Sequence, residues 1–165
     1  MGKDIRYFLL TTRFSLYYIV FVKILFMCVA NSARSQMAEG FARKILGPGH
    51  EVQSAGSHPG RVNPYAIQVM TEIGIDISSN YSKSVDQLSP EFIAGLDYVI
   101  TLCLEEVCPT ILSNAQKLHW PQPDPAANRG SPGEDDKSSA DKELQRFRET
   151  RDAIAEKIKD FAESA

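Results

Sequence analysis

The segment from Val22 to Ala42, VKILFMCVANSARSQMAEGFA, constrains the fold more than any other part of this chain. An apolar run ends at Cys28, and Arg34 and Ser35 follow at the start of an amphipathic helical pattern. The residues between are mostly small, so their backbone N–H groups can curl around an anion above a helix N-terminus. A strand, an anion-binding loop and a helix in this order are typical of a parallel α/β sheet.

The residue types in this loop indicate thiol chemistry on a tetrahedral oxyanion. Cys28 is the expected nucleophile, because the positive field of such a loop favours the thiolate. Arg34 supplies a planar fork for two oxygens, and Ser35 can donate to the thiolate or cap the helix. The expected oxyanion-binding residues are Val29, Ala30, Asn31, Ser32, Ala33 and Arg34. The alternative for Cys28 is an inert buried thiol, and Asn31 is expected to hold an unusual backbone dihedral.

Alternating strand and helix patterns predict an α/β fold with three layers, in which helices flank a four-stranded parallel sheet. The expected strands cover residues 20–27, 50–55, 97–102 and 117–120. The expected helices cover residues 35–46, 64–73, 90–96 and 141–161, with a long loop over 121–140. Ligands of such sheets bind beyond the carboxyl ends of the strands, where the Cys28 loop falls.

The 165 residues are expected to form one catalytic domain over 21–165, preceded by an extension over 1–20 of unassigned structure. A signal peptide cleaved near Ala30 would destroy the loop, and Lys23 interrupts a membrane span, so no membrane association is expected. Three cysteines favour a reducing cytoplasm. The net charge of -3 gives no broad basic field for nucleic acid, and the histidines lack metal-ligand spacing.

Four separate segments resemble the thioredoxin-coupled arsenate reductases, which share the fold of low-molecular-weight protein tyrosine phosphatases. They are the Cys28 loop, Ser54-Ala55-Gly56, Thr101-Leu102-Cys103 and the Trp120 to Pro125 segment. The resemblance implies arsenate as substrate, phosphate as a competing oxyanion, thioredoxin as electron donor and no cofactor. It also implies that Asp124, before Pro125, is the general acid, since the oxygen leaving arsenate must be protonated.

Cys103 and Cys108 distinguish a reductase from a phosphatase, because the reduction of arsenate needs two electrons. The resemblance implies that Cys28 forms an arseno adduct, Cys103 attacks Cys28 to release arsenite, and Cys108 then attacks Cys103. Five residues of ideal helix separate Cα atoms by about 8–9 Å, whereas a disulfide tolerates at most about 7 Å. The 103–108 segment is therefore expected to be a loop, or a helix that unwinds during the cycle.

Two other functions remain open at this point. A low-molecular-weight protein tyrosine phosphatase would need only Cys28, Arg34 and Asp124. An anion-sensing or adaptor domain would keep the fold without the catalytic cycle.

Overall fold

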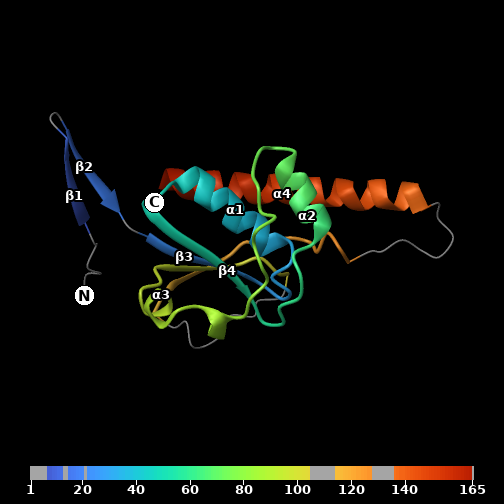
Figure 1. Ribbon diagram of the computed structural model, residues 1–165, viewed down its shortest axis with the longest axis horizontal. Coiled ribbons are helices and arrows are strands. Elements are labelled where there is room, and N and C mark those ends of the chain that lie inside the picture. Colours follow the sequence, from blue (N-terminus) through green and yellow to red (C-terminus); the bar gives the residue numbers. More distant parts are fainter. Residues whose placement is uncertain (1–6, 13–14, 21, 105–113, 128–135, 165) are drawn as a thin grey trace.

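The computed structural model describes residues 7–12, 15–20, 22–104, 114–127 and 136–164 (Figure 1). Its central element is a parallel sheet of four strands in the order β4-β3-β5-β6. The strands are β3 (Val22–Cys28), β4 (His50–Gly56), β5 (Tyr98–Thr101) and β6 (Gln116–His119). The predicted three-layer α/β fold is confirmed, and each strand lies close to its expected range.

The side chains of β3 alternate between two hydrophobic cores, one on each face of the sheet. Ile24 and Phe26 belong to the larger core, and Leu25 and Met27 belong to the smaller one. Because both faces are covered, the strand is apolar at every one of these positions. The larger core lies under α1 (Arg34–Leu46), α2 (Pro64–Thr71) and α4 (Asp136–Ser164), and the smaller one under η1 (Val85–Gln87) and α3 (Pro90–Ala94) (Figure 1).

The helix starts follow the cap residues in the sequence. Asn63 accepts a hydrogen bond from the Tyr65 N–H at 2.9 Å, and Ser89 accepts one from the Phe92 N–H at 3.1 Å. In both cases proline occupies the first helical position, where its missing N–H costs nothing. The final helix begins at Asp136, ahead of the predicted start at residue 141.

Ile45 and Ile73 lie at apolar positions of the expected helices 35–46 and 64–73, where helical spacing predicts burial, but both are exposed. α2 ends at Thr71, and Ile73 lies in the turn that follows it. Ile45 lies in the last turn of α1, where Leu46 packs against the core instead. In both cases apolar residues continue at helical spacing in the sequence after the helix has stopped packing against the core.

The N-terminal residues include two strands outside the main sheet. β1 (Tyr7–Thr12) and β2 (Ser15–Val20) pair as an antiparallel hairpin, a structure that the sequence did not indicate. Val20 therefore ends β2 rather than beginning the first strand of the main sheet, which starts at Val22. Among the described residues, no helix combines the length and apolar character that crossing a bilayer requires.

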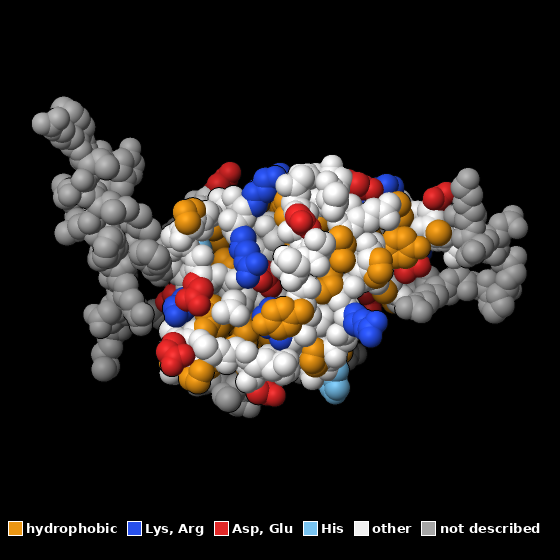
Figure 2. All heavy atoms as spheres, in the orientation of Figure 1, with side chains coloured by type: hydrophobic (Ala, Val, Ile, Leu, Met, Phe, Trp, Pro, Cys, Tyr) orange, Lys and Arg blue, Asp and Glu red, His pale blue; other side chains and the backbone are white. Residues whose placement is uncertain are grey.

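The topology fixes the place of the binding loop. β3 pairs with β4 on one side and with β5 on the other, so the chain winds outward in both directions from β3. The carboxyl end of β3 is thus the topological switch point, where α/β sheets bind ligands. On the face seen in Figure 2, acidic and basic side chains are interspersed rather than gathered by sign.

Candidate active site

The loop that follows β3 turns all of its carbonyl groups outward. Each of these carbonyl groups accepts a hydrogen bond of 2.7 to 2.9 Å from a donor outside the interior of the loop. The donors, in the order of the carbonyls of Val29, Ala30, Asn31, Ser32 and Ala33, are His58 N, Gly60 N, Ser82 Oγ, Asn63 N and Met37 N. The C=O and N–H of a trans peptide point in opposite directions, so the N–H groups of residues 30–34 face the inside of the loop. Such an array of inward N–H groups binds an anion.

The start of α1 is arranged for the same ligand. Its N-cap residue, Ala33, makes no side-chain capping bond, and the first turn holds no acidic residue. The N-terminal N–H groups of the helix are therefore left for a ligand. Asn31 has a φ of 47°, the left-handed conformation that the sequence predicts, and this allows the loop to curl back over Cys28.

Cys28 is buried at the end of β3 and contacts two groups suited to a thiolate. Its Sγ lies 2.9 Å from Ser35 Oγ and accepts a hydrogen bond from the Asn31 N–H at 3.2 Å. Both the Ser35 hydroxyl and the Asn31 N–H can donate a hydrogen bond to the Cys28 sulfur. The contact between Cys28 and Ser35 is the one that the sequence predicts.

Arg34 and Asp124 meet on the open side of the loop. The buried Arg34 guanidinium donates from NH1 to Gln122 O at 3.0 Å, and its NH2 lies 3.8 Å from Asp124 Oδ2. The Asp124 side chain is 47% exposed, and its Oδ1 accepts a hydrogen bond from the Ala126 N–H. Asp124, the predicted acid, therefore lies beside the predicted anion-binding guanidinium and is open to water.

Gly56 allows the end of β4 to approach the loop. A Cβ at this position would lie 2.5 Å from Val29 O and 2.8 Å from Asn31 N, and both of these atoms belong to the backbone. Only glycine therefore fits between β4 and the anion-binding loop. This explains the last residue of the Ser54-Ala55-Gly56 segment on which the resemblance depends.

Comparison with known proteins agrees with this geometry. The family model described as low molecular weight phosphotyrosine protein phosphatase matches residues 23–165. The chain belongs to this phosphatase family. It is 43% identical over 143 residues to an arsenate reductase of Halalkalibacterium halodurans, covering 86% of this chain and 95% of that protein.

Two solved structures are similar to this member of the phosphatase family. One, described as an arsenate reductase in the phosphate binding state, has a TM-score of 0.64 and 32% identity, covering 87% of this chain and 98% of that one. The other is a thioredoxin-dependent arsenate reductase of Corynebacterium glutamicum, with a TM-score of 0.53 and 31% identity. That match covers 81% of this chain and 62% of the other.

Within this phosphatase fold, a second thiol lies against the loop. Cys103 follows β5 and is buried, and its Sγ accepts a hydrogen bond from the Val29 N–H at 3.2 Å. Burial raises the pKa of the Cys103 thiol, while the positive charge of Arg34 acts in the opposite direction. Cys108, the third predicted site cysteine, lies outside the described residues.

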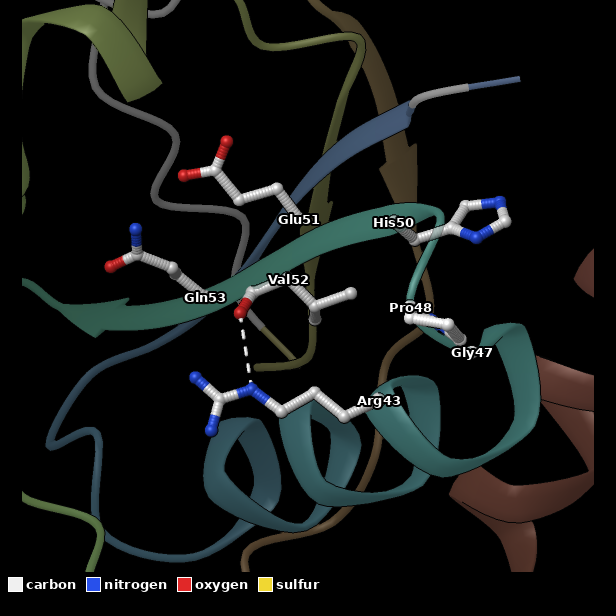
Figure 3. Close-up of a pocket in the computed structure, with 7 residues that line it drawn as sticks. All are labelled: Arg43, Gly47, Pro48, His50, Glu51, Val52 and Gln53. Carbon is white, nitrogen blue, oxygen red and sulfur yellow. Dashed lines mark hydrogen bonds between the residues drawn. The ribbon is translucent and has the colours of Figure 1, made fainter. Parts of the chain in front are cut away.

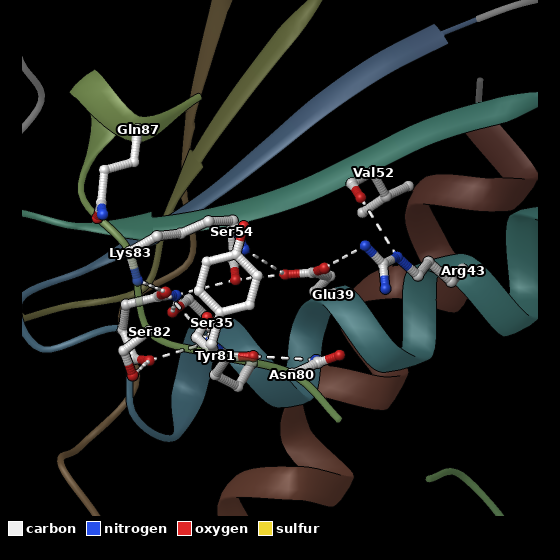
Figure 4. Close-up of polar contacts among 12 residues, drawn as sticks. Ser35, Glu39, Arg43, Val52, Ser54, Asn80, Tyr81, Ser82, Lys83 and Gln87 are labelled. Carbon is white, nitrogen blue, oxygen red and sulfur yellow. Dashed lines mark hydrogen bonds and ion pairs between the residues drawn. The ribbon is translucent and has the colours of Figure 1, made fainter. Parts of the chain in front are cut away.

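The polar groups beneath the loop were not predicted from the sequence. Asn31 Nδ2 donates to Ser35 Oγ at 2.8 Å and to Ser54 Oγ at 2.9 Å, and Ser54 donates in turn to the carboxylate of Glu39 (Figure 4). Lys83 lies beside that carboxylate. The one sequence signal was an acidic residue, Glu39, between small residues on the otherwise buried part of α1.

A hollow elsewhere in the fold is distinct from this site. It has a volume of about 510 Å³ and lies between the end of α1 and the start of β4 (Figure 3). Its lining residues are Arg43, Gly47, Pro48, His50, Glu51, Val52 and Gln53. Ligands of parallel sheets bind at the carboxyl ends of the strands, and this hollow lies at the amino end of β4.

Proposed function

We propose that the chain reduces arsenate to arsenite through three thiols, with thioredoxin as electron donor and phosphate as a competing oxyanion. The chain is an arsenate reductase, as are the relatives that it matches over most of its length. A thiol cycle of this kind suits a reducing compartment, so we place the enzyme in the cytoplasm. Residues 21–165 would form the catalytic domain, with 1–20 as an extension.

The first step is substitution at arsenic. The N–H groups of residues 30–34 and the Arg34 guanidinium bind the oxyanion, and the Cys28 thiolate attacks arsenic. One As–O bond breaks, and Asp124 supplies a proton so that the oxygen departs as water. The product is an arsenic(V) atom bound to Cys28.

The second and third steps move electrons and restore the nucleophile. The Cys103 thiolate attacks Cys28 Sγ, and the S–As bond pair passes to arsenic, which leaves as arsenite. Cys28 and Cys103 are then joined by a disulfide. Cys108 attacks Cys103, which frees the Cys28 thiolate, and the dithiol of thioredoxin reduces the resulting Cys103–Cys108 disulfide.

The position of Cys103 is the observation that carries this proposal. Its sulfur accepts a hydrogen bond from Val29, the neighbour of Cys28 in the chain, so the second thiol lies beside the nucleophile. A phosphatase cycle through Cys28 requires only water at this point. A buried second thiol held to the binding loop instead supports attack on a Cys28 adduct.

The test is arsenite production coupled to thioredoxin, thioredoxin reductase and NADPH oxidation. We expect Cys103→Ser to abolish turnover while Cys28 still reacts with arsenate, and mass spectrometry of the turned-over wild type to find the Cys103–Cys108 disulfide. Because burial raises the pKa of Cys103, arsenite release in a single turnover should accelerate as the pH rises toward that pKa. Arsenate turnover that survives Cys103→Ser would refute the relay, and phosphotyrosine hydrolysis without arsenite formation would favour a phosphatase.

A further inference from the structure

The segment that carries Asp124 has few backbone donors, because proline occupies every second position from 121 to 125. Gln122, between the first two prolines, uses both of its backbone groups. Its N–H donates to Leu102 O at 3.1 Å, and its C=O accepts from Arg34 NH1 at 3.0 Å. One residue therefore ties this acid segment (residues 121–125) both to the end of β5 and to the anion-binding arginine.

The prolines limit how far the Gln122 carbonyl can turn. Pro123 confines the residue before it to extended backbone, and its own ring fixes its φ. Pro125 is buried, and its carbonyl accepts a hydrogen bond from Arg146 Nε of α4 at 3.1 Å. The acid segment is thus restrained on both sides of the carbonyl that contacts Arg34.

Arg34 and Asp124 lie close together without forming a tight ion pair. Arg34 NH2 is 3.8 Å from Asp124 Oδ2, whereas a hydrogen-bonded pair of this type has N–O distances of about 2.7–2.9 Å. The Arg34 side chain is only 10% exposed, so water does little to weaken the attraction. Two contacts oppose closure: Gln122 O accepts from Arg34 NH1, and the Ala126 N–H donates to Asp124 Oδ1 at 3.2 Å.

A closed pair would remove both groups from the proposed reaction. The guanidinium fork of Arg34 would face the Asp124 carboxylate instead of two oxygens of the oxyanion. A carboxyl paired with arginine is also favoured in its ionised form, whereas a general acid must carry a proton. The open arrangement is therefore the one in which cation and acid can act on the same ligand.

We propose that Gln122 is a positioning residue, whose backbone carbonyl keeps Arg34 from closing onto Asp124 and so leaves both groups available to the oxyanion. This inference rests on the proposed roles of Arg34 in oxyanion binding and of Asp124 as the acid. Gln122 acts through its main chain, so its effect depends on the neighbouring prolines more than on its own side chain.

The test is calorimetric titration of the full chain with inorganic phosphate. Pro123→Gly frees the backbone on both sides of the Gln122 carbonyl, so Arg34 can turn and close onto Asp124. Phosphate must then displace the carboxylate from the guanidinium. If the closed pair holds about nine molecules in ten, the apparent phosphate affinity falls about tenfold, which is the result we expect.

Replacing the carboxylate separates capture of Arg34 from a simple loosening of the acid segment. In Pro123→Gly/Asp124→Ala no carboxylate remains at position 124 to capture the guanidinium. Its phosphate affinity should therefore lie within about twofold of that of Asp124→Ala alone, so the two substitutions are strongly non-additive. A segment that only anchored the fold would give the same tenfold loss in both backgrounds.

Pro48→Gly is the matched control for the loss of a proline. Pro48 lies in the turn between α1 and β4, at the opposite end of the sheet from the anion-binding loop, so its phosphate affinity should equal that of the wild type. Two substitutions at Gln122 separate main chain from side chain. Gln122→Pro removes the N–H that reaches Leu102 and should weaken phosphate binding more than Gln122→Ala, which keeps both backbone groups.

Unchanged phosphate affinity in Pro123→Gly would overturn the proposal, and so would a tenfold loss that persists when Asp124 is also replaced. Recovery in the double variant supports it. Phosphate binding involves no thiol step and no thioredoxin, so a failed reductase assay leaves this test intact. If Pro123→Gly does not fold, Gln122→Pro with and without Asp124→Ala gives the same comparison.

Discussion

Glu39 and Glu72 show what burial does to the same kind of ion pair. Each carboxylate contacts two cations: Glu39 contacts Arg43 and Lys83, and Glu72 contacts Arg148 at 2.7 Å and Arg151 at 3.1 Å. The Glu39 side chain is 2% exposed and that of Glu72 is 31% exposed. The first cluster lies beneath the binding loop, whereas the second joins the end of α2 to α4.

The difference lies in what each cluster can control. At the surface an ion pair is screened by water and is worth about 0–1 kcal/mol, so Glu72 helps to hold α4 in place and little more. In the interior a lone carboxylate is far more costly than a paired one. Its partners must therefore stay in place, and Glu39 can fix the geometry of the groups bonded to it.

Substituting one glycine in each region should give the largest contrast. A Cβ at Gly56 would meet backbone atoms of the loop, whereas at Gly74, where φ is 72°, nothing lies within 4 Å. We expect Gly56→Ala to lower the free energy of unfolding by about 3 kcal/mol. We expect Gly74→Ala to lower it by about 1 kcal/mol through its backbone conformation alone.

Urea unfolding measures both effects, and calorimetric titration with phosphate separates the two regions further. Phosphate binding should be lost in Gly56→Ala and retained in Gly74→Ala. Wild-type phosphate affinity in Gly56→Ala would show that the loop does not depend on the close approach of β4.

Removal of each carboxylate tests the comparison directly. Glu39→Ala leaves the Lys83 ammonium buried without its partner, and we expect a loss of about 3 kcal/mol in unfolding free energy. Glu72→Ala leaves Arg148 exposed to water, and the buried Arg151 keeps the Val69 carbonyl and the Asp152 carboxylate as partners, so we expect a loss below about 1 kcal/mol. Urea unfolding of both variants at neutral pH gives the two values, and equal losses would contradict the role assigned to burial.

These regions also differ in how much of them the sequence could predict. Cys28, Arg34 and Ser35 lie in one contiguous segment, so spacing along a strand, a loop and a helix was enough to bring them together. The Asn63-Pro64 cap was predictable for the same reason. The residues that form these features lie close together in the sequence, so local sequence patterns are sufficient to predict them.

Contacts between distant segments left no such pattern. Lys83 reaches Asn31 across 52 positions, and Ser54 reaches Glu39 across 15. Their meeting depends on β4 lying beside β3 and on the chain returning past Gly56, which only the folded sheet determines. The roles of Cys103 and Cys108 came from resemblance rather than from spacing, and the contact of Cys103 with Val29 was not predictable from either.

The smallest expected effect is the acid dependence of the surface cluster. The hydrogen bond from Arg148 holds the pKa of the Glu72 carboxyl below its usual value of 4.5. A carboxyl with a lower pKa in the folded than in the unfolded state adds stability above the unfolded value and loses it as the pH falls through the folded value. The difference in unfolding free energy between the wild type and Glu72→Gln should therefore stay below about 1 kcal/mol at pH 7 and shrink as the pH falls below about 4.5. Urea unfolding of both proteins across this range measures the difference, and the same difference at every pH would mean that the charge of Glu72 contributes nothing to the junction of α2 with α4.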